Sequence, residues 1–490
     1  MEASSEFRRR EPTLLAIFAA KGPAAIEFRC GDAAMTEKSY QLSQESGECR
    51  LKPCAGLWLQ PAQSGVLVMK APKLTGRRSF IAAGSMSLAA MTAPALAEGV
   101  QPEGADKRKE PGTFNLWVMS DAHVSTDKAV SVAIQHGLVG FTPPPVRPDS
   151  LATALQQSES GSPIGGPSIP WDIALNLGDY AGYWDPPEDG QGREIIRQFG
   201  VLKQHRRELI YDLAGNHDAS PPDAPESHGK EENWWFRKWA DPLGEHPETS
   251  LVDNAKRPYK IDGTYERYTF KVGNIRVIMM SDRNDLPYPV GRRASGGASP
   301  AGAVTPETFE WWKGQVERAR ANNEIIITCH HHMLRETTVG SGDFEGVAQN
   351  PDGTYRRGKY HGADGAPEGS SYLYFLGDKP KAQAFEKYMA ARPGAIDLWL
   401  GGHTHTFPDD VFNGRSHVER KWDVNFVNCA QLSKFHSTVT FPPMSRHFGF
   451  SEGSRLVRVR LYLHDDTYAA PGWYAPSERV LEFSRPFYWT

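Results

Sequence analysis

The chain has 490 residues, of which 39% are hydrophobic and 11% aromatic, so it can bury one large core or two ordinary ones. Its formal net charge is −4, and charges of one sign form no long run, which argues against a nucleic-acid or anionic-membrane partner. A small substrate suits this charge balance better.

Residues 69–97 have the layout of a secretory signal. They begin Met-Lys-Ala-Pro-Lys-Leu-Thr-Gly-Arg-Arg, continue with an apolar run rich in Ala and Ser, and end in Ala95-Leu96-Ala97, so a basic start precedes an apolar middle and a small-residue cleavage site. The pair Arg77 and Arg78 indicates the bacterial twin-arginine export machinery. We therefore expect a periplasmic or secreted protein. The apolar run is too short for a comfortable membrane span, and we expect no stable span after cleavage.

Residues 1–68 precede this signal, although a signal peptide belongs at the start of the chain that is made. We therefore expect residues 1–68 to be a misassigned and disordered upstream extension. Cleavage after Ala97 leaves residues 98–490, which we expect to form a single domain. The cysteines of this part, Cys329 and Cys429, imply no disulfide framework.

Short apolar runs predict buried strands, and apolar residues at helical spacing predict helices. After a polar lead, 98–112, the expected strands are 114–120, 172–177, 208–214, 265–272, 274–281, 324–329, 396–400, 424–427 and 455–463. The expected helices are 128–138, 193–207, 234–239, 308–322 and 381–391. Residues 143–170, rich in Pro, Gly and Ser, predict a loop. The long Gly-rich stretch 335–371 is expected to border or cover the substrate.

Five of the expected strands end in polar motifs. In chain order these are Asp121-x-His123, Gly178-Asp179, Gly215-Asn216-His217-Asp218, His330 and Gly402-His403-x-His405. In open α/β sheets ligands bind beyond the carboxyl ends of the strands, and alternate residues of an extended chain face the same way. Oxygen and nitrogen ligands without a thiolate suit Mn, Fe or Zn. Without His217 and Asp218, these motifs offer seven ligands. Seven are too many for one tetrahedral ion and fit two divalent ions that share one carboxylate.

The order of these motifs resembles the calcineurin-like metallophosphoesterase superfamily over about residues 112–408. The resemblance implies an α/β fold, a four-layer α/β/β/α sandwich. It also implies one role for each motif residue: Asp121, His123 and His405 bind the first metal, Asn216, His330 and His403 bind the second, Asp179 bridges both, His217 is the catalytic histidine, and Asp218 orients it. Because three histidines stand in a row, His331 is an alternative to His330.

The resemblance further implies hydrolysis of a small phosphorylated substrate, a phosphomonoester or a phosphodiester. Two ions neutralise the phosphoryl oxygens and lower the pKa of a bridging water, whose hydroxide attacks phosphorus. His217 would then assist the leaving group. The alternative is an exported metal-binding protein of the same fold without turnover. The His217-Asp218 pair, which binds no metal in this scheme, argues against that alternative.

Overall fold

The structure is a computed structural model, and it describes residues 40–45, 48–53, 112–124, 149–182, 187–219, 233–283, 302–342, 346–349, 355–358, 371–379, 383–429, 431–436 and 439–489. The chain divides into two units, Met1–Gln101 and Pro102–Thr490. In the first unit, β1 (Tyr40–Glu45) and β2 (Glu48–Pro53) pair as an antiparallel hairpin, within a segment that we expected to be disordered. The predicted signal, 69–97, and the predicted helix 128–138 lie outside the described residues.

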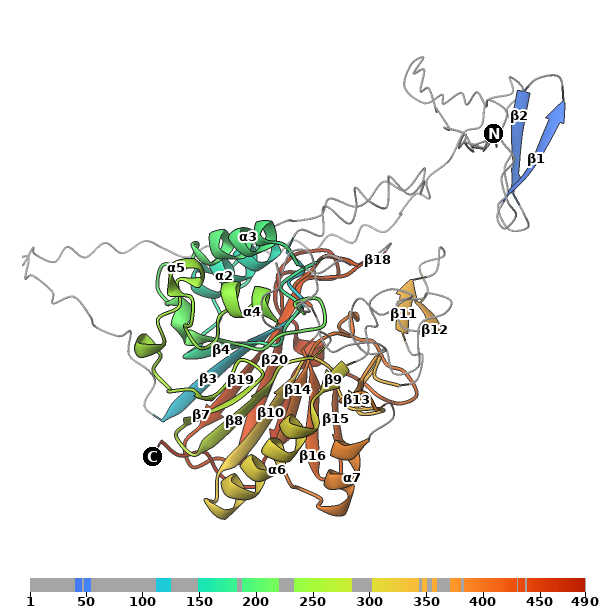
Figure 1. The fold of residues 1–490 in the computed structure, drawn as a ribbon. Coiled ribbons are helices and arrows are strands. Elements are labelled where there is room, and N and C mark those ends of the chain that lie inside the picture. Colours follow the sequence, from blue (N-terminus) through green and yellow to red (C-terminus); the bar gives the residue numbers. More distant parts are fainter. Residues whose placement is uncertain are drawn as a thin grey trace, which may run out of the picture. The chain divides into compact units, whose positions relative to one another are not determined.

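Two sheets form the centre of the second unit (Figure 1). The first has the strand order β21-β20-β19-β3-β4-β5, and β22 pairs with β20. Its strands are β3 (Thr113–Met119), β4 (Ile173–Asn176), β5 (Ile210–Asp212), β19 (Met444–Ser451), β20 (Leu456–Leu463), β21 (Gly472–Trp473) and β22 (Arg479–Glu482). The strands β3, β4 and β5 run parallel, whereas β19 runs antiparallel to β3.

The second sheet has the order β15-β16-β14-β10-β8-β7-β6. Its strands are β6 (Asp262–Gly263), β7 (Arg267–Val272), β8 (Ile275–Met280), β10 (Ile325–His330), β14 (Leu398–Gly401), β15 (Val418–Lys421) and β16 (Val424–Asn428). The strands β8, β10, β14 and β16 run parallel. The strands β7 and β8 form the antiparallel pair predicted around Gly273, which adopts a left-handed φ of 53°.

Helices cover the outer face of each sheet (Figure 1). The first sheet packs against α2 (Ser150–Ser160), α3 (Asp189–Phe199) and α4 (Trp234–Trp239), and the second against α6 (Pro306–Ala321) and α7 (Ala384–Ala391). The remaining short elements are α5 (Pro247–Ser250), β9 (Gly302–Val304), β11 (Gly346–Gln349), β12 (Tyr355–Gly358), β13 (Leu373–Leu376), β17 (Phe435–His436), β18 (Val439–Thr440) and the 3-10 turns Arg207–Leu209, Asn254–Lys256 and Ala475–Ser477. Among the described residues, no helix is long and apolar enough to cross a membrane.

The alternation of side chains along the strands produces the layers. In β3, Leu116 and Val118 enter the core between the two sheets, whereas Trp117 and Met119 face the helices. Neighbouring side chains of a strand point to opposite faces, and both faces are buried here, so the strand is apolar throughout. Helix, sheet, sheet and helix therefore follow one another, which is the α/β/β/α sandwich expected from the resemblance.

One local prediction was wrong. Residues 143–170 were expected to be a loop, but Ser150–Ser160 form α2. Its apolar face is narrow, with Leu151, Ala154 and Leu155 buried against the first sheet. The flanking Pro and Gly residues hid this short amphipathic pattern, because the rest of the helix is mostly Ser, Thr and Gln.

Candidate metal centre

Polar residues from both sheets meet beyond the carboxyl ends of the parallel strands. The backbone N–H of His403, after β14 of the second sheet, donates to Asp121 Oδ2 after β3 of the first, at 2.9 Å. The N–H of Asp282, after β8, donates to the carbonyl of Ala214 at 2.8 Å, which again joins the two sheets. The sheets therefore hold the ends of their strands against one another, as the strand-end motifs predicted.

Asp121, His123 and His405 form the first group of candidate ligands. The Nε2 atom of His405 lies 3.1 Å from Asp121 Oδ1, and the Nε2 atom of His123 lies 3.5 Å from the same oxygen. The two imidazole Nε2 atoms are 3.0 Å apart. All three side chains are buried, so the arrangement brings these predicted ligands together in a place shielded from water.

Asp179 lies between this group and the histidines of the second sheet. Its Oδ2 atom is 3.8 Å from His123 Nε2 and 3.0 Å from His331 Nε2. Asn216 is buried in the neighbouring turn after β5. A carboxylate that faces imidazoles on two sides is placed as a bridging ligand would be.

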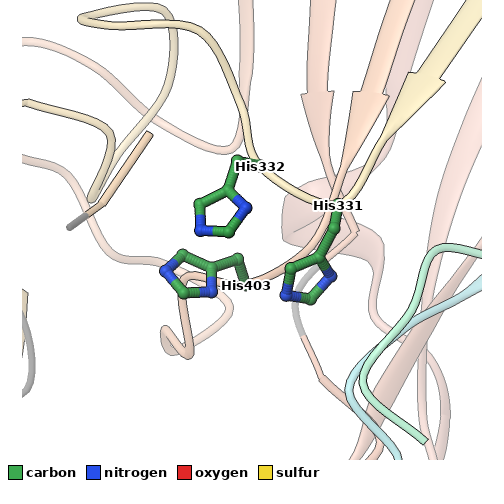
Figure 2. Close-up of side chains that lie close together, drawn as sticks. All are labelled: His331, His332 and His403. Atoms are coloured by element: carbon green, nitrogen blue, oxygen red, sulfur yellow. The ribbon is translucent and has the colours of Figure 1, made fainter. Parts of the chain in front are cut away.

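The second group consists of His331, His332 and His403, whose candidate ligand nitrogens lie within 4.8 Å of one another. Figure 2 shows their rings facing one another, with His331 and His332 from the chain after β10 and His403 from the loop after β14. The ring centroids of His332 and His403 are 3.8 Å apart. The three consecutive histidines thus contribute two members to this group.

His330, the first choice from sequence, points elsewhere. In β10, Ile327 and Cys329 face the core between the sheets, whereas Ile326 faces the helices. His331 continues the inner series and reaches Asp179, but His330 belongs to the outer series. The Nε2 atom of His330 lies 3.8 Å from Asp282 Oδ2 instead. The geometry therefore favours His331, the alternative, as the ligand from this motif.

Sequence reasoning missed Asp282. This carboxylate is fully buried, and its Oδ2 atom lies 3.0 Å from His332 Nδ1. Asp282 follows β8 in the same way that Asp121 follows β3, so the strand-end rule that identified the other motifs could have found it. Burial raises the pKa of Asp282 to about 6, although the charges of His330 and His331 oppose this rise.

Backbone carbonyls fix the orientation of two imidazoles. His331 Nδ1 lies 2.7 Å from the carbonyl of Leu177, and His123 Nδ1 lies 3.1 Å from the carbonyl of Ala181. Because a carbonyl only accepts, each Nδ1 carries a proton, and each Nε2 is turned towards the carboxylates. An imidazole nitrogen 3.0 Å from a carboxylate oxygen is stabilised by positive charge between them, either a proton on that nitrogen or a metal ion bound by both groups. The donor set of imidazoles, carboxylates and an amide fits divalent transition ions.

The pKa values describe the same opposition of charges. Burial by itself would raise the pKa values of Asp121 and Asp179, but nearby imidazoles, His331 first, hold both well below their usual range. Burial would lower the pKa of His331, yet Asp179 and Asp121 raise it to about 10. The carboxylates therefore stay ionised and attract positive charge to this point, which is a further property of a cation site.

Four of the candidate ligand residues adopt strained backbone conformations. Asp121, His123, Asp179 and His403 have left-handed φ values of 54°, 43°, 57° and 66°. Such conformations in residues other than glycine cost about 1–3 kcal/mol each and concentrate at functional sites. They turn each side chain sharply at the end of its strand and towards the centre.

Two glycines permit the loops to approach this closely. A Cβ on Gly215 would lie 2.2 Å from Asp179 Oδ1. A Cβ on Gly402 would lie 2.0 Å from Ser120 Oγ and 2.5 Å from Asp121 Oδ2. These distances are far below van der Waals contact, so both positions require a residue without a side chain.

The pair His217 and Asp218 lies on the turn after β5. The backbone N–H of His217 donates to Asp179 Oδ1 at 2.8 Å, and the ring lies edge-on to His123 with centroids 4.8 Å apart. His217 is half-buried, whereas the proposed ligands around it are buried. Its imidazole is therefore the one in this cluster best placed to meet a group that enters from solvent.

Asp218 is fully buried and binds backbone. Its Oδ2 atom accepts from the N–H groups of Asp179 at 2.8 Å and Gly215 at 2.9 Å, and Oδ1 accepts from Ala181 at 3.0 Å. Sequence reasoning assigned Asp218 to orienting the imidazole of His217. These three bonds show that its carboxylate holds the Asp179 turn and the Gly215 turn together, and the orienting role of Asp218 stays a prediction.

Two opposed sheets with carboxylates, imidazoles and an amide gathered at their strand ends define a metal-dependent hydrolase of the α/β/β/α type. Residues 114–407 match the family model described as calcineurin-like phosphoesterase. The chain therefore belongs to the calcineurin-like phosphoesterase family, and it is a metal-dependent phosphoesterase. The clusters of His and Asp are consistent with a two-metal site.

Matches to solved structures were also found. A dimetal phosphatase from Danio rerio is 8% identical, with a TM-score of 0.37, and the match covers 76% of this chain and 100% of that one. A conserved uncharacterized protein from Streptococcus pneumoniae TIGR4, described as a predicted phosphoesterase, is 10% identical, with a TM-score of 0.27 and coverage of 76% and 98%. Vacuolar Protein Sorting 29 from Cryptosporidium parvum is 10% identical, with a TM-score of 0.27 and coverage of 76% and 100%. No curated protein sequence matched the chain.

Proposed function

We propose that the protein hydrolyses phosphate esters, monoesters or diesters, with two divalent ions of the Mn, Fe or Zn type. The observation that carries this proposal is the position of Asp179, whose carboxylate lies between imidazoles of both sheets. A carboxylate in this position suits an ion on each side. The substrate we propose is a small phosphorylated molecule.

We propose the division of ligands that the resemblance implies, with one change. Asp121, His123 and His405 would hold the first ion, and Asn216, His331 and His403 the second, with Asp179 shared. His331 replaces His330 in this proposal because its Nε2 atom is the one beside Asp179. When bound, two such ions neutralise phosphoryl oxygens and lower the pKa of water.

Two further side chains would assist the reaction without binding the metals. His217 is positioned to donate a proton to the departing oxygen, because its half-buried ring stands beside the Asp179 group. Asp218 would act through the backbone, by holding the turns that present Asp179 and Asn216. General acid assistance of this kind contributes typically about 10²–10⁴-fold to the rate.

A reconstituted assay tests the proposal. The metal-free protein is loaded with Mn or with Zn, its metal content is measured, and hydrolysis of an aryl phosphate monoester is compared with that of the matching diester. We expect two ions per chain and turnover of at least one ester, and we expect Asp179→Asn to lose both metal and activity. Two bound ions without hydrolysis of either ester would contradict the proposal and support a metal-binding protein without turnover.

We also propose that residues 69–97 direct export by the twin-arginine machinery, and that residues 98–490 work in the periplasm or outside the cell. The support is the order of basic pair, apolar run and Ala95-Leu96-Ala97 site. Replacement of Arg77 and Arg78 together by Lys should keep the protein inside the cell, as cell fractionation would reveal. A native precursor that begins before Met69 would contradict the view of residues 1–68 as an upstream extension.

A further inference from the structure

A polar cavity of about 100 Å³ lies beside the loop that carries His403 and His405. Its walls are residues 408–411 and 416–418, the side chain of Arg446 from β19, and residues Ser477 and Arg479. A cavity that admits one water needs only about 10–15 Å³ on this measure. The space is therefore large enough for several waters or for one small polyatomic ion.

Arg446 is the unusual residue of this cavity. It occupies the strand position two residues before Phe448, which belongs to the core between the sheets, so its side chain also points inward. It is only 1% exposed. Its Nε donates to the carbonyl of Asn428 at 2.7 Å, but neither Nη1 nor Nη2 has a hydrogen-bond partner among the described residues. Two buried guanidinium donors are thus left for a ligand.

No carboxylate of the described residues forms an ion pair with Arg446, although two lie in the cavity wall. Asp410 Oδ2 accepts from the N–H of Phe407 at 2.7 Å. Asp409 Oδ2 accepts from the hydroxyl of Tyr468 at 2.9 Å and also from that of Tyr474. A buried charge without a counter-charge is strongly unfavourable, so an anion from outside the chain would stabilise Arg446.

Arg479 and His417 also line the cavity. Arg479 uses Nη1 for the carbonyls of Pro476 and Glu478, at 2.9 and 2.8 Å, and these carbonyls carry no net charge. Burial is the main cause that lowers the pKa of Arg446 to about 10; the nearby Cys429 opposes this shift and Arg479 adds to it. Burial, then Arg446 and Arg479, hold the pKa of His417 well below its usual range. The two arginines therefore supply the positive charge of the cavity, while Asp409 and Asp410 lie elsewhere in its wall.

We propose that this cavity binds a small tetrahedral oxyanion, of the size and charge of inorganic phosphate or sulfate, through Arg446 Nη1 and Nη2, with Arg479 as the second positive group. A planar guanidinium matches two oxygens of such an ion with two parallel N–H donors. The site is separate from the metal ligands, because none of them lines the cavity.

The bound anion would stabilise the loop of the metal centre. Arg446 Nε holds the carbonyl of Asn428, and the side chain of Asn428 donates to Thr404 Oγ1, between His403 and His405. The His417 ring contacts Thr406 Oγ1 at 2.7 Å. An ion that fixes Arg446 therefore restrains the loop from behind, without touching the metals.

Diffraction from crystals grown in selenate tests the site directly, because selenium gives an anomalous signal. We expect an anomalous peak within hydrogen-bond distance of Arg446 Nη1 and Nη2 in the wild type, and no peak there in Arg446→Met. Water alone in the wild-type cavity would overturn the proposal, and so would a selenate peak that persists in Arg446→Met.

Thermal unfolding of the metal-loaded protein provides the solution test. The midpoint is followed against sulfate and, separately, phosphate, with chloride at matched ionic strength. We expect the midpoint to rise with both oxyanions, because a ligand that binds only the folded state stabilises it. The apparent dissociation constant should be at least about tenfold weaker in Arg446→Met, since 1.4 kcal/mol corresponds to one factor of ten. Arg479→Gln should weaken binding about threefold. Because Arg479 is exposed, this variant is expected to fold even if Arg446→Met does not.

Arg392→Gln is the matched control, because it also removes one positive charge but lies at the exposed end of α7. It should bind sulfate as the wild type does. Because sulfate and phosphate also approach metal ions, the titration is repeated in Asp179→Asn, where the rise in midpoint should persist. A rise that vanishes in Asp179→Asn, or that is unchanged in both Arg446→Met and Arg479→Gln, would assign the effect to the metal centre and overturn the proposal.

Discussion

His217 differs from its neighbours in exposure. The residues that we propose as ligands are buried, whereas His217 is half-buried, and its backbone N–H donates to Asp179 Oδ1. A group that delivers a proton must reach the substrate, but a ligand must be shielded from water. The proposed division between metal ligands and a proton donor therefore follows the depth of the side chains in the site.

Replacement of His217 by Ala should separate these roles. We expect both ions to remain, as measured by elemental analysis, and kcat to fall by about 10²–10⁴-fold on an alkyl phosphate. The fall should be smaller on an aryl phosphate, because its leaving oxygen needs less protonation. Full activity of His217→Ala on the alkyl ester would rule out the acid role.

The three consecutive histidines give a second residue-scale prediction. His331→Ala should lose about one ion per chain, because its Nε2 atom is the one that faces Asp179. His330→Ala, whose Nε2 atom faces Asp282, should retain both ions and should lose stability instead. Metal content and unfolding midpoint, measured on both variants, decide the assignment. The opposite pattern would restore His330 as the ligand.

At the scale of elements, the site depends on turns that place strand ends close together. Gly215 touches the turn of Asp179, and both turns are bonded to the carboxylate of Asp218. The left-handed φ of Asp179, 57°, is held by the same bonds. The turn after β4 and the turn after β5 therefore behave as one unit.

Gly215→Ala should disrupt this unit. Its Cβ would lie 2.2 Å from Asp179 Oδ1, so we expect loss of metal, loss of activity and a lower unfolding midpoint. Gly314→Ala is the matched control, because in helix α6 nothing lies within 4 Å of the added Cβ. There the gain in helix propensity should stabilise the protein by about 0.5–1 kcal/mol. A Gly215→Ala protein with wild-type metal content would show that the close approach is unnecessary.

The sequence predicted most of these elements, since the strands that carry the motifs are short apolar runs with polar ends. It could not decide between His330 and His331, because β10 is buried on both faces and its apolar run shows no alternation. The strand β19 was not predicted, since Arg446 and Gly449 interrupt its apolar residues. Asp282 could have been found from the sequence, because it is a polar residue that directly follows a predicted strand. Its pairing with His332 could not, because that pairing depends on contacts between distant segments.

At the scale of the whole molecule, buried neutral histidines outside the metal centre set the response to acid. His464 Nδ1 donates to Gln157 Oε1 at 2.7 Å, and Ser445 Oγ lies 2.8 Å from its Nε2. His447 has Arg460 Nη2 at 3.2 Å from Nδ1 and Asn115 Oδ1 at 3.1 Å from Nε2. The His447 ring must be neutral to accept from Arg460 while it donates to Asn115. Burial lowers both pKa values to about 3.

Stability should therefore fall as the pH falls from about 6.5 towards 3. The unfolded imidazole has a pKa near about 6.5, so in this interval the unfolded chain binds more protons than the folded one. Each histidine contributes at most about 1.4 kcal/mol per pH unit to this slope. His447→Gln keeps one donor and one acceptor without titrating, and its urea unfolding between pH 5 and 7 should show a shallower slope than the wild type. Equal slopes would mean that His447 is protonated in the fold.

The proposed metal ligands come from both sheets, Asp121 and Asp179 from one side and His331 and His403 from the other. This division would couple ion affinity to the packing between the sheets. Any ion held across that boundary resists the separation of the layers, and by thermodynamic reciprocity whatever tightens the layers tightens the hold on the ion. A substitution of a core residue such as Phe448 or Ile327, which is not itself a proposed ligand, would then change the metal affinity. The packing of the apolar core between the sheets is therefore expected to contribute to the affinity for metal ions.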